Sequence, residues 1–274
     1  MAQKPKTIVL IHGLWMTPRS WESFQAFYKE RGYNVLAPPW PRMEGEVEDL
    51  RRDASVLAGL GVLEIADHYE KIMETLGEPP ILMGHSFGGL IVQILLDRGF
   101  GAAGVAIDPV PPRGVFRLPF SALKAASAVL ANPLNGMRVV PLTFKQFQYA
   151  FANNMNEEKG RAFYDRYAIP GPGRPVFQVA AANLTPHGAT TVNYDNAIRA
   201  PLLLIAGGQD NQVPVSMIKE NFTRYAGSTA TTAFKEFRRR SHLILLQDGW
   251  QEIAAYALSW AEANAGDIGL LKAA

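Results

Sequence analysis

Residues 81–96 read ILMGHSFGGLIVQILL, which is a short apolar run, a glycine-rich turn and a second apolar run. The first run has the length of a buried strand, and the second has the length of a helix. Gly84, Gly88 and Gly89 surround Ser86 at the junction. A sharp strand-to-helix turn strains the backbone of its central residue and leaves no room for side chains on its neighbours. The stretch therefore predicts a strand, a tight turn and a helix, with Ser86 at the tip of the turn.

Short apolar runs of this kind recur along the chain and alternate with helical patterns. We expect strands at 7–11, 33–37, 81–83, 102–107, 201–208 and 231–237. Helices are predicted at 18–32, at 46–76 with a break near Gly59 and Gly61, at 87–98, from 213 onward and at 247–263. This alternation is typical of parallel strands that are buried on both faces. The sequence predicts an α/β fold with a mostly parallel sheet of about six strands and helices on both faces.

The segment 111–199 interrupts the alternation and is rich in proline and aromatic residues. Thr143 and Gln146 have the spacing of a capping box, which predicts a helix with Phe144, Phe147 and Phe151 on one face. A second helix is predicted at 157–167. We therefore expect a helical cap, 111–199, inserted after the fourth strand of a core made of 1–110 and 200–274.

Composition excludes several classes of protein. The chain has 274 residues, 48% of them hydrophobic, and a net charge of +2, which gives no reason to expect a nucleic-acid partner. It has no cysteine, and hence neither disulfides nor thiolate metal sites. No apolar run approaches the roughly 18 residues of a membrane span, and the run at 7–11 is too short for a signal peptide. We expect a cytoplasmic protein without a metal or cofactor; its oligomeric state stays open.

The glycine-rich turn matches the pattern G-x-S-x-G as Gly84-His85-Ser86-Phe87-Gly88. Between a strand and a helix, this pattern indicates a nucleophilic serine. The turn lifts the hydroxyl of Ser86 off the sheet and places the amide of Phe87 at a helix N-terminus. The alternative is a tightly packed turn in which Ser86 merely caps the helix. The strand before it and the helix after it favour the nucleophile.

A serine hydroxyl needs a base to become nucleophilic at neutral pH. His242 is the favoured base because it follows the last predicted strand, at the strand's carboxyl end. His187 is the alternative, and it is expected to line the pocket where the cap rejoins the sheet. His12 and His85 are interpreted as structural, and His68 as a solvated residue in the middle of a helix.

The base in turn needs a carboxylate that fixes its tautomer. Asp210 follows the fifth strand in AGGQDNQVP, and Asp108 follows the fourth in AIDPVPP. Both lie at strand ends, and both keep the chain order serine, aspartate, histidine. Asp210 is favoured, because an aspartate before proline, such as Asp108, is a common turn former.

Acyl transfer also needs donors for a developing oxyanion. His12-Gly13-Leu14-Trp15 follows the first strand, which is expected to neighbour the strand before Ser86. We therefore expect the amides of Leu14 and Phe87 to face the same point.

Four features together resemble the α/β-hydrolase superfamily: strand-HG-x, G-H-S-x-G-G, G-x-D-x-x-V-P at residues 208–214, and a late histidine before a terminal helix. More narrowly, the chain resembles esterases, lipases and lactonases with a helical cap. The resemblance implies Ser86 as nucleophile, His242 as base and Asp210 as acid, with Leu14 and Phe87 as oxyanion donors. It also implies a fold that lacks the first two strands of the family's sheet. Ser241 stands before the histidine, where the family usually has glycine.

These observations predict a cofactor-independent serine hydrolase that cleaves a small to medium hydrophobic carboxylic ester through an acyl-enzyme. Substrate contacts are expected from Trp15, Phe144, His187 and Val213. Alternatives with the same fold and triad are a lyase such as a hydroxynitrile lyase, a perhydrolase or an acyltransferase. A ligand receptor is a further alternative, disfavoured because binding alone would not require all three triad residues. The arginines at 238–240 are interpreted as a solvated rim rather than a site for an anionic group.

Overall fold

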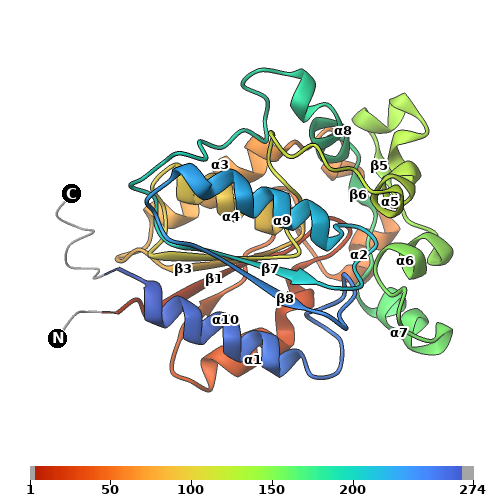
Figure 1. Cartoon of the computed structure of the whole chain (residues 1–274). Helices are drawn as coiled ribbons and strands as arrows, with labels where there is room; N and C mark the ends of the chain where they lie inside the picture. The colour runs from red at the N-terminus through yellow and green to blue at the C-terminus, as the bar shows by residue number, and fades with distance from the viewer. Residues whose placement is uncertain (1–3, 267–274) are drawn as a thin grey trace.

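The computed structural model describes residues 4–266 and contains a six-stranded, wholly parallel sheet (Figure 1). Its strand order is β2-β1-β3-β4-β7-β8. The strands are β1 (Thr7–Ile11), β2 (Asn34–Leu36), β3 (Ile81–His85), β4 (Ala103–Ile107), β7 (Leu202–Gly207) and β8 (Thr232–Phe237). The predicted α/β class and sheet are confirmed, and strand ends differ from the prediction by one or two residues.

Burial explains why the central strands are apolar throughout. Every residue of β1, β3, β4 and β7 is buried. Helices α1 (Glu22–Lys29) and α10 (Trp250–Asn264) cover one face of the sheet, and α3 (Val62–Glu74), α4 (Phe87–Asp97) and α9 (Val215–Arg224) cover the other (Figure 1). A strand between two apolar layers needs hydrophobic side chains on both its faces.

The predicted helices are shorter than the sequence suggests, and each difference has a local cause. The stretch 18–32 divides into a 3-10 turn, η1 (Pro18–Trp21), and α1, with left-handed Gly32 beyond. The stretch 46–76 divides into α2 (Val47–Arg52), η2 (Ser55–Leu57) and α3. The backbone is extended at Asp53, after α2, and Gly59, before α3, has a left-handed φ of +71°. Helix α10 begins at Trp250, since Gly249 before it has φ +79°. A last turn, η5 (Tyr225–Gly227), follows α9.

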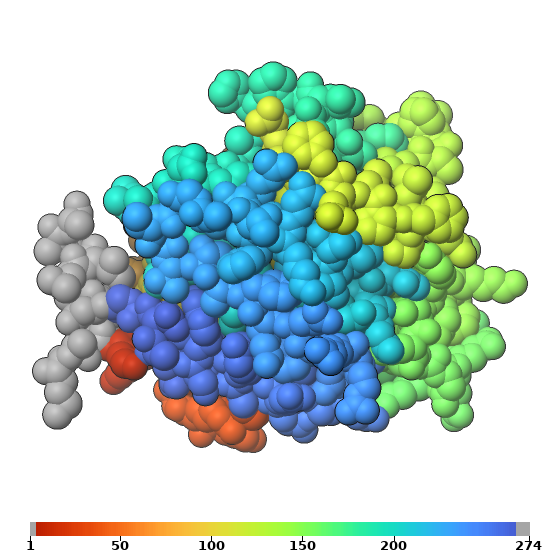
Figure 2. Space-filling model, in the orientation of Figure 1, coloured from red at the N-terminus to blue at the C-terminus, as the bar shows by residue number. Residues whose placement is uncertain are grey.

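Four α-helices, two short 3-10 helices and a small antiparallel sheet lie between β4 and β7. They are α5 (Phe120–Leu130), η3 (Pro133–Met137), β5 (Val139–Val140), α6 (Phe144–Ala150), α7 (Glu157–Tyr167), β6 (Gly171–Pro172), α8 (Arg174–Ala180) and η4 (Ala182–Leu184). The predicted capping box of Thr143 and Gln146 opens α6. No local sequence pattern indicated α5 or α8. Much of this segment, yellow to green, gathers at the right of Figures 1 and 2.

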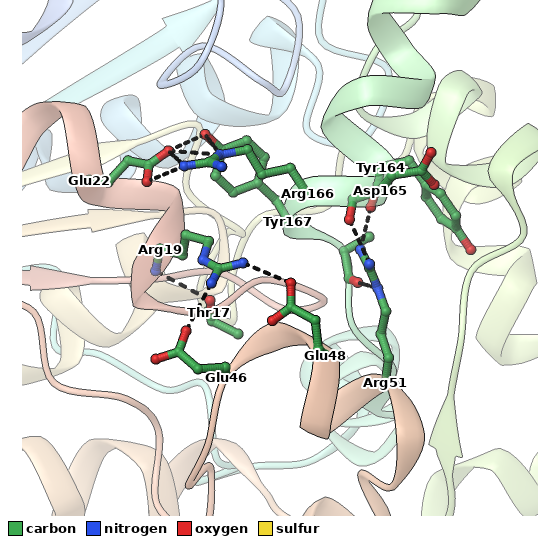
Figure 3. Close-up of polar contacts among 11 residues, drawn as sticks. Thr17, Arg19, Glu22, Glu46, Glu48, Arg51, Tyr164, Asp165, Arg166 and Tyr167 are labelled. Carbon is green, nitrogen blue, oxygen red and sulfur yellow. Dashed lines mark hydrogen bonds and ion pairs between the residues drawn. The ribbon is translucent and has the colours of Figure 1, made fainter.

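Helix α7 is fastened to the segments that follow β1 and β2 (Figure 3). The guanidinium of Arg51, from α2, donates to the carbonyl oxygens of Tyr164, Asp165 and Ala168 at 2.6, 2.5 and 2.7 Å. These carbonyls lie in the last turn of α7 or just after it, and that of Tyr164 also accepts from the N–H of Ala168 at 3.1 Å. Arg166 also forms an ion pair with Glu22 of α1 at 2.7 Å. The end of α7 is thus held against α1 and α2, which follow the first two strands of the main sheet.

No described helix combines the length and the apolar character that a bilayer-spanning segment needs.

Candidate functional site

Ser86 occupies a strained turn between β3 and α4. Its backbone angles are φ 57° and ψ −120°, which few residues other than glycine adopt. A Cβ at Gly84 would lie 2.1 Å from the carbonyl oxygen of Gly88, and a Cβ at Gly88 would lie 2.1 Å from that of Ile11. These contacts leave no space for a side chain. Close backbone packing is therefore the physical reason for the glycines that the sequence places around Ser86.

His242 and Asp210 are brought together by the loops after β8 and β7. Nδ1 of His242 lies 2.6 Å from Oδ2 of Asp210, and both side chains are fully buried. The other oxygen of Asp210 accepts from the N–H groups of Gln212 at 2.6 Å and Val213 at 2.9 Å. Three donors thus satisfy the Asp210 carboxylate and fix its orientation toward the imidazole.

Several buried polar atoms around this pair have no partner in the described chain, and Oγ of Ser86 and Nε2 of His242 are among them. A carboxylate only accepts hydrogen bonds, so Nδ1 of a neutral His242 carries the proton that faces Asp210. Its Nε2 is then a bare acceptor. The serine hydroxyl is a donor, and the two unpaired atoms are chemically complementary.

His85 links the serine turn to the histidine loop. Its Nε2 donates to the carbonyl oxygen of His242 at 2.9 Å, and the two ring centroids are 4.7 Å apart. Phe151 packs edge-on against the His242 ring, with the centroids 5.1 Å apart. Burial is the main cause that holds the pKa of His85 well below its usual value, so this ring is neutral. A structural role was predicted for His85, but the contact with His242 was not, because the two residues lie 157 positions apart.

Asp108, the alternative acid, is fully buried at the end of β4 and has a positive φ of 43°. Its Oδ1 accepts from the N–H of Gly207 at 2.5 Å, and its Oδ2 has no partner among residues 4–266. Burial, and then the nearby charge of Asp210, raise the pKa of Asp108 well above its usual value. No hydrogen bond joins Asp108 to His242 in the described chain, whereas one joins Asp210 to it.

His85, Asp108 and His242 each place one possible metal-ligating atom within 4.8 Å of the others. The sequence spacing did not indicate this group, because its members lie far apart in the chain, at the end of β3 and in the loops after β4 and β8. One ring nitrogen of each histidine already has a hydrogen-bond partner: Nε2 of His85 donates to the carbonyl oxygen of His242, and Nδ1 of His242 faces Asp210.

The turn after β1 lies directly against the serine turn. A Cβ at Gly13 would lie 2.8 Å from Cβ of Ser86, so only glycine allows this approach. Phe87 is the first residue of α4, where backbone N–H groups lack intrahelical acceptors. His12 is buried, accepts from the N–H of Trp40 at 3.2 Å, and has its pKa lowered by burial to about 4. Its predicted structural role agrees with these contacts.

An apolar cavity of about 320 Å³ adjoins these turns. It is lined by Trp15, Phe87, Val110–Pro112, Val115–Leu118, Ala122, Leu123, Ala125, Ala126, Leu130, Val176, Val179, Ala180, Ala182, Asn183, Gln212, Val213 and Met217. Trp15 and Val213 were expected here. Most of the remaining lining comes from the segment after β4, including α5 and α8, which the sequence pattern did not locate.

Two expected contacts need correction, because His187 and Phe144 do not line the cavity. His187 is exposed, in a turn with a positive φ of 59°. Phe144 packs instead against Tyr164, with ring centroids 5.8 Å apart, and the guanidinium of Arg161 lies 3.6 Å from its centroid. The aromatic face predicted for α6 is thus divided: Phe147 and Phe151 point inward and Phe144 packs outside.

The three arginines before the histidine differ in their surroundings. Arg238 and Arg239 are exposed, in keeping with a solvated rim. Arg240 donates to the carbonyl oxygens of Asp248 and Gly249 and pairs with Glu252 at 3.6 Å. Ser241 is buried and its N–H donates to Oε1 of Gln247 at 2.9 Å, a contact that fixes the turn before His242.

Comparison with known proteins places this geometry in a wider context. No curated protein matches the sequence. An extracellular alpha/beta-hydrolase from a Paenibacillus species has 20% sequence identity and a TM-score of 0.66, over 94% of this chain and 99% of that one. The monoacylglycerol lipase of Paleococcus ferrophilus also has 20% identity and a TM-score of 0.66, over 96% and 97%. Polyneuridine aldehyde esterase has 17% identity and a TM-score of 0.62, over 94% and 100%.

These similarities in structure concern the fold. The model of the "Alpha/beta hydrolase family" matches residues 8–256, which is most of the sequence and includes Ser86, Asp210 and His242. The chain belongs to the alpha/beta hydrolase family.

Proposed function

We propose that the chain is a serine hydrolase that cleaves a small to medium hydrophobic carboxylic ester. The observation that carries this proposal is the buried His242–Asp210 pair beside the strained Ser86 turn. The esterase and the lipase among the similar folds support the same class. The apolar cavity supports a hydrophobic substrate group.

In the proposed reaction, Oγ of Ser86 attacks the ester carbonyl while its proton passes to Nε2 of His242. Asp210 stabilises the resulting imidazolium through its hydrogen bond to Nδ1. The N–H groups of Leu14 and Phe87 donate to the oxyanion. His242 then protonates the departing alcohol, which leaves the acyl group on Ser86.

Hydrolysis of this acyl-enzyme repeats the proton transfers. Water gives a proton to Nε2 of His242 as its oxygen attacks the acyl carbon. The same proton returns to Oγ of Ser86 when the acid departs. Residues 111–199 are proposed to act as a cap that excludes bulk water, because they supply most of the cavity lining.

Steady-state hydrolysis tests the proposal. The wild-type protein should hydrolyse p-nitrophenyl esters of short and medium acids, and Ser86→Ala should reduce kcat by about 10⁴-fold or more. A panel of lactones and amides defines the range of acyl substrates. An Ser86→Ala variant with wild-type turnover would refute the proposed nucleophile. Binding of the same esters without turnover by the wild-type protein would favour a receptor instead.

A further inference from the structure

Most of the cavity wall is apolar, so its few polar side chains are informative. They belong to Arg117, Asn183 and Gln212. The amide of Asn183 is already satisfied: Oδ1 accepts from the N–H of Gly114 and Nδ2 donates to the carbonyl of Val115, both at 2.7 Å. The side chain of Arg117 belongs to an exposed residue, which water can solvate. Gln212 differs from both.

Oε1 of Gln212 is buried and has no hydrogen-bond partner within residues 4–266. A buried amide oxygen without a partner is unfavourable, and native proteins rarely keep one unless a ligand or a water satisfies it. An apolar side chain of similar size would fit an apolar wall without this cost. The position of Gln212 therefore points to a donor that arrives with a ligand.

The backbone of Gln212 is held at the reaction centre. Its N–H donates to Oδ1 of Asp210 at 2.6 Å, on the carboxylate whose other oxygen faces His242. Val213, the next residue, also lines the cavity. Gln212 thus lines the same cavity as Phe87, whose N–H is the proposed oxyanion donor, and the loop of Gln212 carries the proposed acid.

We propose that Gln212 is a specificity-determining residue, which binds a hydroxyl group one or two carbons from the scissile ester of a substrate whose apolar chain fills the cavity. The substrate class is then a hydroxylated medium-chain ester rather than a plain alkyl ester. This inference rests on the proposed ester hydrolysis and adds the polar group that the substrate carries. A site that hydrogen-bonds a substrate hydroxyl discriminates against the analogue without it, because its own polar group is left unpaired.

Matched ester pairs test the inference. The acyl series compares p-nitrophenyl octanoate with its 2-hydroxy and 3-hydroxy derivatives, and the alcohol series compares octyl acetate with the 1-acetate of 1,2-octanediol. Hydrolysis is followed by pH-stat for the wild type and for Gln212→Met, which keeps the side-chain volume. Gln209→Met is the control, because Gln209 is on the same loop but is exposed and does not line the cavity.

The quantity compared is the ratio of kcat/KM for the hydroxylated ester to kcat/KM for its parent. Gln212→Met should lower this ratio about tenfold in at least one series, through KM, while the parent ester is still hydrolysed. Gln209→Met should leave the ratio unchanged. Should Gln212→Met unfold, Gln212→Asn, which withdraws the amide by one carbon, should lower the ratio in the same direction.

An unchanged ratio in every pair, with active enzyme, would overturn the role of Gln212 and leave the proposed hydrolase intact. No hydrolysis of any parent ester by the wild-type protein would instead overturn the proposed function.

Discussion

Replacing each of the two buried aspartates by asparagine separates their roles. In Asp210→Asn, the amide oxygen is expected to keep the N–H donors of Gln212 and Val213, which lie at 2.6 and 2.9 Å. Its NH₂ group would then face Nδ1 of His242, now 2.6 Å from a carboxylate oxygen. Because an NH₂ group only donates, Nδ1 must be the unprotonated nitrogen that accepts from it. The proton of the neutral ring is then on Nε2. His242 can then no longer accept the proton of Ser86.

The expected loss follows from that tautomer. Triads with the wrong histidine tautomer lose about 10⁴-fold in kcat. For Asp108→Asn we expect a loss of less than about tenfold, because a neutral amide matches the protonated acid and still accepts from the N–H of Gly207. Initial rates of hydrolysis of one p-nitrophenyl ester at pH 7 to 8 measure the loss in each variant. Equal losses, or a larger loss for Asp108→Asn, would refute the assignment of Asp210 as the acid.

The Asp108→Asn variant also tests whether Asp108 is protonated in the folded protein. Burial raises the pKa of Asp108 when folded, so the folded protein keeps a proton that the unfolded chain releases above about pH 4. This group therefore lowers stability as pH rises toward its folded pKa. The unfolding free energy of Asp108→Asn should fall less between pH 5 and 8 than that of the wild type. An identical slope would mean that Asp108 is ionised in the fold.

Three further predictions concern the turn after β1 and the cavity. Gly13→Ala should reduce kcat at least about 100-fold, because its Cβ would lie 2.8 Å from Cβ of Ser86; wild-type kcat would contradict the close approach. His12 has its pKa lowered from 6.5 to about 4, so stability is lost as pH falls through that window, by about 3 kcal/mol from this residue. Denaturant titrations of His12→Asn should show a flatter acid limb, and an unchanged limb would contradict the buried neutral ring. Ala122→Trp should fill part of the cavity and raise KM about tenfold for p-nitrophenyl octanoate but not for the acetate; equal effects on both would move the acyl chain elsewhere.

The sequence was most informative where local chemistry and periodicity agree. Fully buried parallel strands need apolar runs, and these located all six strands of the main sheet within one or two residues. The glycines around Ser86 predicted a tight turn because their missing side chains are a direct steric requirement. The positions of His242 and Asp210 after predicted strands indicated that they lie at the same edge of the sheet. In the structure Nδ1 of His242 is 2.6 Å from Oδ2 of Asp210.

Long-range packing was much harder to predict. His187 and Phe144 looked suitable for a pocket, yet one is exposed and the other packs on the outer side of α6. Helices α5 and α8, of 11 and 7 residues, pack against each other from separate parts of the inserted segment, and no local sequence pattern specifies such a contact. The contact between His85 and the His242 carbonyl is of the same kind.

The central claim is that Ser86 is an activated nucleophile, and covalent labelling measures this directly. A fluorophosphonate probe is incubated with the wild type, Ser86→Ala and His242→Ala, and the adduct is located by peptide mass mapping. We predict one adduct, on Ser86, which is absent from Ser86→Ala and forms at least about 100-fold more slowly in His242→Ala. An adduct on another residue, or equal labelling of Ser86 with and without the imidazole, would contradict the account.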